Sequence, residues 1–331
     1  MIRVALNGFG RIGRRVFRLL HEHPEMEVVA INDLADSKTL SHLLKYDSIH
    51  GIFKTTISFN ETHIIVNNKS ILFSNYNHPK DTDWQTSNVD IVIEATGKFK
   101  LHSDLQHHIS NGAKKVILAV PALEDNIPTI VIGVNDSILN GSESIVSNAS
   151  CTTNNAAPMI AVINELAHVK QAYITTVHSY TTDQSLHDQP HRDLRRARAA
   201  GQSIVPTTTG AAKALTKIFP ELSDVIGGCG IRVPVANGSL TDITFNVEKT
   251  VSVEDINSAF KKASKTQFKG ILEYTEDPIV SIDIVGNTNS CIFDAQMTSV
   301  IGNMIKIIGW YDNETGYSSR LIELVSKLSS K

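Results

Sequence analysis

The sequence predicts an α/β protein, with a doubly wound parallel sheet in residues 1–150 and an α+β domain with a mixed or antiparallel sheet in residues 151–315. Up to residue 150, short apolar runs alternate with longer amphipathic stretches, which is typical of βαβ units and a parallel sheet. Beyond it, long β-rich segments enclose a helical stretch. A chain of 331 residues also exceeds the usual size of a single core, so two domains are expected.

The strands expected in the first domain are short apolar runs bounded by Gly, Asn or Asp. They are IRVAL (2–6), VVAIN (28–32), DIVIEA (90–95), KVILAV (115–120), TIVIGV (129–134) and SIVSN (144–148). A helix is predicted over RRVFRLLHEHP (14–24), because its apolar residues recur at helical spacing and Pro24 would end it.

The second domain is predicted to open with AYITTVHSY (172–180), an edge-like or half-buried strand. The polar, basic residues that follow lack apolar periodicity, and a segment of that length without its own core is usually a functional or interface loop. The further elements predicted are β-rich segments at 239–252 and 303–312, a helix at 253–265 capped by Ser252, and a C-terminal helix within 316–331 that joins the first domain.

Composition narrows the class of protein. Thirty-one Lys and Arg stand against 34 Asp and Glu, a net charge of −3, which gives no reason to expect nucleic acid or an anionic membrane as partner. We see neither a signal peptide nor an apolar run of the roughly 18 residues that a membrane span needs. The three cysteines are widely spaced, which argues against a disulfide framework or a zinc site. The expectation is a soluble cytoplasmic protein without a metal.

A glycine motif suggests a nucleotide site. Gly8-Phe9-Gly10-Arg11-Ile12-Gly13 follows the first strand and opens a helix, so a pyrophosphate could sit on the N–H groups of the helix start. Asp33 lies 20 residues beyond Gly13, at the end of the next strand, where a carboxylate would bind a ribose 2′-hydroxyl and repel a 2′-phosphate. The alternative is a glycine turn that only packs helix on sheet. The combination favours a Rossmann-type domain that binds NAD rather than NADP.

Cys151 is a candidate nucleophile. Its neighbours in SNASCTTNN (147–155) are polar, and it directly follows a strand and precedes an apolar pattern of helical spacing. A cysteine at a helix start would have a lowered pKa, because the helix dipole stabilises a thiolate. The alternative is a buried, inert cysteine, the commoner fate of this residue type.

His178 is the candidate proton shuttle. It ends a strand 27 residues after Cys151, and a strand–helix–strand passage of that length can return the chain alongside its start. A histidine beside a cysteine can take its proton and later pass one to the substrate. With 13 histidines in the chain, a structural or surface role is the alternative.

Candidate anion-binding residues cluster after His178. Arginines gather in the long loop, and Thr207-Thr208-Thr209-Gly210 offers hydroxyls and backbone N–H groups at a helix start. The set is Thr181, Asp183, Arg195, Arg196, Arg198, residues 207–210 and Arg232. Solvated surface charge or an oligomer interface are the alternatives, but together these residues suggest phosphate groups near the cysteine.

Six motifs occur in one order along the chain: NGFGRIGR (7–14), SNASCTTN (147–154), HSYT (178–181), DLRRARAA (193–200), PTTTGAAKA (206–214) and WYDNETGYS (310–318). Together they closely resemble the phosphorylating glyceraldehyde-3-phosphate dehydrogenases over essentially the whole chain. The resemblance implies a homotetramer whose residues 151–315, including the loop 179–203, form the catalytic domain.

The resemblance implies that Cys151 attacks the aldehyde to form a thiohemiacetal, with His178 as base. Hydride would pass to NAD, and inorganic phosphate would cleave the resulting thioester to an acyl phosphate. The expected phosphate-binding residues are Thr181, Asp183 and Arg232 for the substrate, and Ser150, Thr152, Arg196, Thr209 and Gly210 for the attacking phosphate. The expected cofactor-binding residues are Asn7, Gly8, Gly10, Arg11, Ile12, Gly13, Asp33, Thr96, Gly97, Ala119, Asn313 and Tyr317. One reaction requires all of these parts, which favours the nucleophile hypothesis for Cys151.

The sequence also departs from the family pattern. Asn155 stands where a second cysteine is frequent, Ala119 where serine is common, and Gln189 in place of a leucine that helps exclude NADP. VPVANGSL (233–240) also differs from the usual version. We therefore expect NAD, with NADP as a weaker second cofactor. The rival functions are erythrose-4-phosphate dehydrogenase, a cysteine hydrolase that would have no use for the glycine motif, and a non-catalytic NAD-binding regulator.

Overall fold

A computed structural model describes residues 1–21 and 23–330 of the chain. It divides into two compact units. Unit 1 comprises Met1–Ile130, Asp136–Ala149 and Ser318–Lys331, and unit 2 comprises Val131–Asn135 and Ser150–Tyr317. The predicted fold class, an α/β protein with a Rossmann-type parallel sheet and a second mixed sheet, is confirmed.

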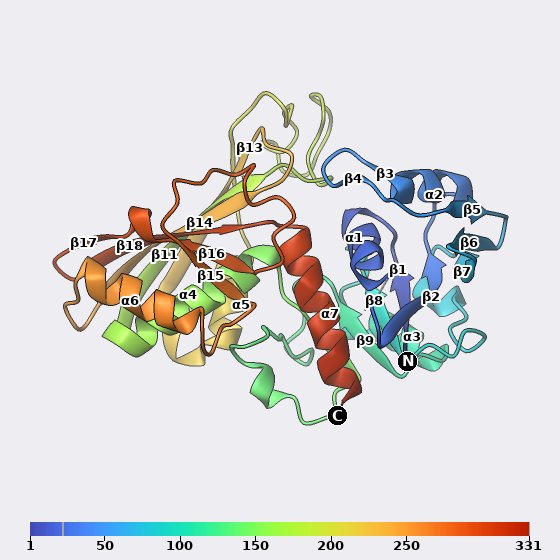
Figure 1. The fold of residues 1–331 in the computed structure, drawn as a ribbon, viewed down its shortest axis with the longest axis horizontal. Helices are drawn as coiled ribbons and strands as arrows, with labels where there is room; N and C mark the ends of the chain where they lie inside the picture. Colours follow the sequence, from blue (N-terminus) through green and yellow to red (C-terminus); the bar gives the residue numbers. More distant parts are fainter. Residues whose placement is uncertain (22, 331) are drawn as a thin grey trace. The chain divides into compact units, whose positions relative to one another are not determined.

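Unit 1 is built on one sheet (Figure 1). Its strands, in spatial order, are β10 (Ile145–Ser147), β9 (Lys115–Leu118), β8 (Ile91–Glu94), β1 (Ile2–Asn7), β2 (Met26–Asn32), β7 (Lys69–Ser74), β6 (His63–Val66) and β5 (Ile57–Phe59). The strands from β10 to β7 are parallel, in the order of a dinucleotide-binding sheet, and β6 and β5 continue antiparallel. Parallel strands are covered on both faces, which is why the central β1 and β8 are apolar and buried.

Short helices flank this sheet. They are α1 (Arg11–Leu20), α2 (Ser37–Lys45) and α3 (His102–Ser110), with single turns at Pro79–Asp81 and Asp136–Ile138 and a small pair of strands, β3 (Tyr46–Asp47) and β4 (Gly51–Ile52). α1 packs on β2, and α3 packs on β9 and β10. α1 begins at residue 11 rather than 14, because the helix starts directly at the glycine turn.

One predicted strand of the first domain is wrong. In 129–134, only Thr129 pairs with β10, and the chain turns after it. The Asn135 side chain accepts a hydrogen bond from the Val131 N–H (2.8 Å), and Gly133 has a φ of +82°. Apolar composition alone could not reveal this turn, because its cause is a polar side chain beyond the run.

Unit 2 contains a mixed sheet. Its strands, in spatial order, are β12 (Val205–Thr207), β13 (Ile226–Val233), β11 (Val169–Ser179), β14 (Ser239–Val247), β18 (Met304–Tyr311), β16 (Cys291–Asp294) and β15 (Leu272–Thr275), with β17 (Ser299–Ile301) paired to β18. The strand predicted as edge-like or half-buried is half-buried, and its place between β13 and β14 excludes the edge position. Its partners come about 54 to 78 residues later in the chain, a pairing that local pattern does not encode.

The helices α4 (Cys151–Ala167), α5 (Ala211–Ile218) and α6 (Val253–Ala263) lie along one face of this sheet (Figure 1). α4 is buried over most of its length, and Phe260 of α6 stacks on Phe293 of β16 at 3.8 Å between ring centroids. Ser252 caps α6 as predicted, in a reciprocal capping box with Asp255. Single turns at Pro220–Leu222 and Ala295–Met297 and the C-terminal α7 (Thr315–Ser329) complete the fold.

Residues 180–204, between β11 and β12, contain neither helix nor strand, as the sequence predicts for most of that stretch. Of the helices in the described ranges, none has the length and apolar character needed to cross a membrane.

Candidate active site

Cys151 is the first residue of α4, and Ser150 is the N-cap. The Ser150 hydroxyl accepts a hydrogen bond from the Thr153 N–H at 3.1 Å, which satisfies one of the unpaired donors of the first turn. The Cys151 Sγ lies 3.4 Å from His178 Nε2. The two residues that the sequence singles out therefore meet, because β11 returns beside the start of α4.

His178 and Arg232 are opposite one another in the parallel strands β11 and β13. Arg232 Nη1 lies 2.6 Å from His178 Nδ1 and donates to the Ser179 carbonyl at 2.9 Å. That carbonyl is also 2.7 Å from His178 Nδ1. A guanidinium can only donate, so Nδ1 accepts when it bonds Arg232, and Nε2 then carries the proton that faces the sulfur. Nδ1 bonds the Ser179 carbonyl only as a donor, in the other tautomer, so these two contacts alternate.

The electrostatics of this pair differ from the expectation based on the helix start. Burial raises the pKa of the Cys151 thiol, and the positive charge of Arg232 only partly opposes this. Burial, with Arg232 adding to it, lowers the pKa of His178 to about 3. The predicted lowering of the Cys151 pKa is thus wrong, because desolvation outweighs the stabilisation of a thiolate at the helix start. At neutral pH both partners are uncharged.

Tyr311 was missed as a site residue. Its buried hydroxyl lies 2.9 Å from Thr152 Oγ1 and 2.8 Å from Thr176 Oγ1, and its ring is edge-on to His178 at 5.9 Å. It therefore ties α4, β11 and β18 together behind the cysteine. The available signal is its place in the motif at 310–318, which supplied only Asn313 and Tyr317 as site residues.

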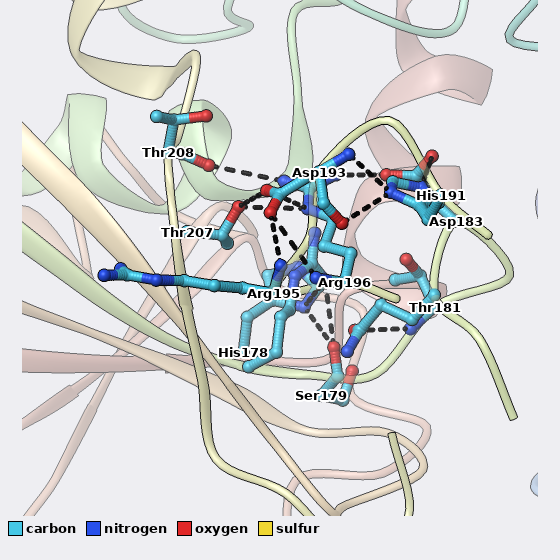
Figure 2. Close-up of polar contacts among 12 residues, drawn as sticks. His178, Ser179, Thr181, Asp183, His191, Asp193, Arg195, Arg196, Thr207 and Thr208 are labelled. Carbon is cyan, nitrogen blue, oxygen red and sulfur yellow. Dashed lines mark hydrogen bonds and ion pairs between the residues drawn. The ribbon is translucent and has the colours of Figure 1, made fainter. Parts of the chain in front are cut away.

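Arg196 is the centre of a charged cluster in the long loop (Figure 2). Figure 2 shows Arg196 between Asp183 on one side and Asp193 with the threonines of 207–208 on the other. Arg196 donates to Asp183, and its Nε donates to Thr207 Oγ1 at 3.0 Å. Asp183, expected on the substrate phosphate, forms an ion pair with Arg196, which is expected on the attacking phosphate.

The remaining residues expected to bind phosphate are spread around this cluster. The Thr181 N–H lies 3.3 Å from the Gln184 side-chain oxygen. Gly210 is the N-cap of α5, and the Thr209 hydroxyl accepts from the Ala211 N–H at 3.2 Å. Arg196 contributes to lowering the pKa of both His178 and Arg232, so the two guanidinium groups act on the same site. That concentration of positive charge suits an anion.

Asn313 is buried and held in one orientation. Its Oδ1 accepts hydrogen bonds from Ser179 Oγ (2.9 Å), Ser239 Oγ (3.0 Å) and the Gly238 N–H (3.3 Å). This fixes which atom of the amide is oxygen and leaves the Nδ2 end to meet a ligand acceptor. Tyr317, also expected to bind the cofactor, is buried in the first turn of α7.

Unit 1 has a pocket of about 270 Å³ at the carboxyl ends of its parallel strands. Its lining includes the expected residues Asn7, Gly8, Gly10, Asp33 and Thr96. Asp33 accepts from the Phe9 N–H at 2.7 Å, so it is attached to the glycine turn.

The glycine turn itself depends on close backbone approach. Gly8 has a φ of +95°, and a Cβ there would lie 2.7 Å from the Thr96 nitrogen. A Cβ at Gly13 would lie 2.2 Å from the Gly8 carbonyl oxygen. Gly10 is the N-cap of α1 and supplies no side-chain cap, which suits a phosphate at the helix start.

Besides Gly13, four residues of unit 1 that are expected to bind the cofactor do not line this pocket. Arg11 and Ile12 lie in the first turn of α1, where Arg11 forms an ion pair with Asp47 at 2.8 Å. Gly97, with a φ of +67°, follows Thr96, and Ala119 is buried after β9. Conversely, the sequence interpretation missed Asn32, which lines the pocket, and the buried Glu94 beneath it.

Comparisons with known proteins cover both units. The model of the glyceraldehyde 3-phosphate dehydrogenase NAD binding domain matches residues 2–102, and that of the C-terminal domain of the same enzyme matches residues 150–313. Glyceraldehyde-3-phosphate dehydrogenase 1 of Bacillus cereus is 49% identical over 333 residues, spanning 100% of this chain and 99% of that protein. The dehydrogenases of Geobacillus stearothermophilus (49% identity, 100% and 99% coverage) and Borreliella burgdorferi (50%, 99% and 99%) are similarly related.

Proposed function

The chain belongs to the glyceraldehyde-3-phosphate dehydrogenase family, and from that premise we propose that it oxidises D-glyceraldehyde 3-phosphate with NAD and phosphate to 1,3-bisphosphoglycerate and NADH. It is an NAD-dependent oxidoreductase that acts on an aldehyde. Within the site, the observation that carries the phosphorylating reaction is the Cys151–His178 contact of 3.4 Å beside the Arg232 guanidinium.

The residues of unit 1 fit NAD. The pocket offers a glycine turn, an α1 start without a side-chain cap and the Asp33 carboxylate for a ribose hydroxyl. Bound NAD supplies the acceptor for the hydride that leaves the substrate carbon. In unit 2, the fixed Asn313 amide is proposed to donate from Nδ2 to the carboxamide of the cofactor.

The chemical steps depend on the thiol proton. As Cys151 Sγ attacks the aldehyde carbon, the thiol proton passes to His178 Nε2, and the carbonyl oxygen then takes it up to give a thiohemiacetal. His178 next receives that hydroxyl proton as hydride leaves the carbon, which yields a thioester on Cys151. A phosphate oxygen attacks the thioester, the C–S bond breaks, and the thiolate is released with the acyl phosphate.

Arg232 can prepare His178 for this role. While Arg232 donates to Nδ1, Nε2 carries a proton and cannot accept another. When the guanidinium turns to a substrate phosphate, Nδ1 can instead carry the proton and donate to the Ser179 carbonyl, 2.7 Å away. The Nε2 lone pair then faces the thiol, so binding of the phosphorylated substrate would activate the base.

The first test is the phosphate dependence of the rate. NADH formation from glyceraldehyde 3-phosphate is expected to require inorganic phosphate, because the thioester otherwise hydrolyses slowly. Erythrose 4-phosphate, the substrate of the nearest rival function, is expected to react more slowly. Initial rates for each aldehyde, with and without phosphate, measure both. A rate indifferent to phosphate, or a preference for the tetrose, would contradict the assignment.

Asp33→Ala is expected to raise the use of NADP relative to NAD by about tenfold or more, because it removes both a hydrogen-bond acceptor for the ribose and a repulsive charge. The ratio of kcat/KM for the two cofactors measures this. Asp36→Ala is the control, since Asp36 caps α2 nearby and does not line the pocket. An unchanged ratio in Asp33→Ala would contradict the role of Asp33 in choosing the cofactor.

We further propose that residues 1–150 with the C-terminal helix form the NAD-binding domain, that residues 151–315 form the catalytic domain, and that the enzyme is a cytoplasmic homotetramer accepting NADP weakly. The side chains of Tyr173, Ile301 and Met304 support the assembly, because they are about half or more exposed and line a groove of about 700 Å³ on unit 2. The phosphorylated aldehyde and phosphate are the proposed small-molecule partners.

A further inference from the structure

The last residues of four neighbouring parallel strands in unit 1 are joined side chain to side chain. Ser74 ends β7, Asn32 ends β2, Asn7 ends β1 and Glu94 ends β8, and the strand register places each opposite the next. Ser74 Oγ donates to Asn32 Oδ1 (3.0 Å), Asn32 Nδ2 donates to Asn7 Oδ1 (2.8 Å), and Asn7 Nδ2 donates to Glu94 Oε2. The polar chain therefore crosses the carboxyl edge of the sheet.

The Glu94 carboxylate is the hydrogen-bond acceptor at one end of this row of side chains. The Thr96 N–H donates to Glu94 Oε1 at 2.9 Å, and the Thr96 hydroxyl donates to the same oxygen. His108 Nε2 lies 3.2 Å from Oε2, and Trp84 Nε1 donates to His108 Nδ1 at 2.9 Å. Because an indole N–H can only donate, His108 carries its proton on Nε2 and donates it to Glu94.

The position of this chain links it to the cofactor. Asn7, Asn32 and Thr96 line the pocket, while Glu94 and His108 have no exposed surface. Burying a carboxylate costs free energy of folding unless it is fully hydrogen-bonded. Apolar side chains could fill the ends of these strands without that cost. With a donor at one end and an acceptor at the other, the Asn7 amide has only one orientation. Fixing pocket groups before the ligand arrives lowers the entropy cost of binding.

We propose that Glu94 is a positioning residue for the cofactor, which holds Asn7 and Thr96 in place for NAD and is itself held by His108 and Trp84. The inference rests on the proposed function only in taking NAD as the occupant of this pocket. Glu94, His108 and Trp84 lie outside the motifs from which the cofactor site was expected.

The test is Glu94→Gln, which keeps the shape but presents an NH₂ group where only donors point. If the NH₂ group takes the place of Oε2, Asn7 Nδ2 and His108 Nε2 both lose their acceptor. If it takes the place of Oε1, the Thr96 N–H and hydroxyl lose theirs. The Kd for NAD, measured by calorimetry without substrate, is expected to rise about tenfold or more. The KM for NAD should rise in parallel, while kcat and the KM for the aldehyde stay within about twofold.

The matched control is Ser37→Ala, which removes a hydrogen bond of 2.7 Å to the Asn60 carbonyl in the same unit, away from the pocket. It is expected to lower the thermal stability without changing the Kd for NAD. If Glu94→Gln is less stable than the parent but binds NAD as tightly, the row of hydrogen-bonded side chains is only structural and the proposal is overturned. A parent protein that fails to bind NAD would instead overturn the proposed function.

Trp84→Phe gives a second route if Glu94→Gln does not fold. It removes the indole N–H that fixes the His108 tautomer, and a few-fold rise in the Kd for NAD is expected. The parent offers a spectroscopic readout, because Trp84 and Trp310 are its two tryptophans. In Trp310→Phe, Trp84 is the remaining tryptophan, and titration with NAD should change its fluorescence emission. The Kd from this titration should equal the Kd measured by calorimetry. If the Trp84 emission does not change when NAD is added, and Trp84→Phe binds NAD with an unchanged Kd, the proposal is overturned.

Discussion

Cys151→Ser is expected to abolish NADH formation, with kcat lowered at least about a thousandfold, while NAD still binds. A serine hydroxyl is a far weaker nucleophile than a thiol, and the neutral His178 beside it is a weak base because burial lowers its pKa to about 3. An oxygen ester would also be less reactive toward phosphate than a thioester. Initial rates and calorimetric NAD binding check the two parts of the prediction.

The control for this substitution is Cys229→Ser. Cys229 is a free, partly exposed cysteine in β13, and its sulfur contacts Thr175 Oγ1 at 3.8 Å. Its replacement is expected to leave kcat within about twofold. Retention of most activity by Cys151→Ser would refute the nucleophile assignment, and loss of activity in both variants would point to damage to the fold.

The fold could be predicted where local pattern and tertiary structure agree. The buried strands β1, β8 and β9 are continuous apolar runs, because both faces of a parallel sheet are covered. The antiparallel strands β5 and β6 were missed, since their sequences are short and mixed in polarity. The run at 129–134 is as apolar as a strand, but the Asn135 side chain takes the N–H that a neighbouring strand would need.

The candidate site could be predicted in part for a similar reason. The position of Cys151 at a helix start follows from the sequence, because Ser150 is a good N-cap and the residues after it have helical spacing. The approach of Arg232 to His178 could not be deduced, because it depends on the register of β11 with β13 across 54 residues. The direction of the Cys151 pKa shift was wrong because burial is a property of the folded structure.

The pairing of Asp183 with Arg196 shows a further limit. Both are candidate anion-binding residues from their place in the long loop, and the resemblance assigns each to a phosphate site, although a carboxylate repels a phosphate. In the structure Asp183 is a counter-ion of Arg196. Which charges of a polar loop neutralise one another depends on its path, and a segment without periodicity does not reveal that path.

His178→Asn is expected to lower the rate of NADH formation by about 100- to 10,000-fold, because it removes the group that takes the thiol proton. It should also move the pH dependence of Cys151 alkylation by iodoacetamide to higher pH. His178, with a pKa of about 3, is neutral at pH 5 and above, and the pKa of the Cys151 thiol is raised above its ordinary value, so between about pH 7 and 11 the only protonation change in the pair is that of the thiol. Losing the Nε2 contact at 3.4 Å destabilises the thiolate, so the pKa of Cys151, already raised by burial, rises further.

Stopped-flow NADH formation and alkylation rates across that pH range measure the two effects of His178→Asn. His168→Asn is the control, because His168 is exposed at the end of α4 with a φ of +54°, a conformation that asparagine tolerates. It should change neither quantity. An alkylation curve that stays in place in His178→Asn, with a rate lowered less than tenfold, would mean that His178 only fills space beside Cys151. A lowered rate of NADH formation together with an alkylation curve shifted to higher pH would instead show that the reactivity of the thiol depends on the imidazole. Through Nδ1 of His178, it would then also depend on Arg232 and on the phosphate of the substrate.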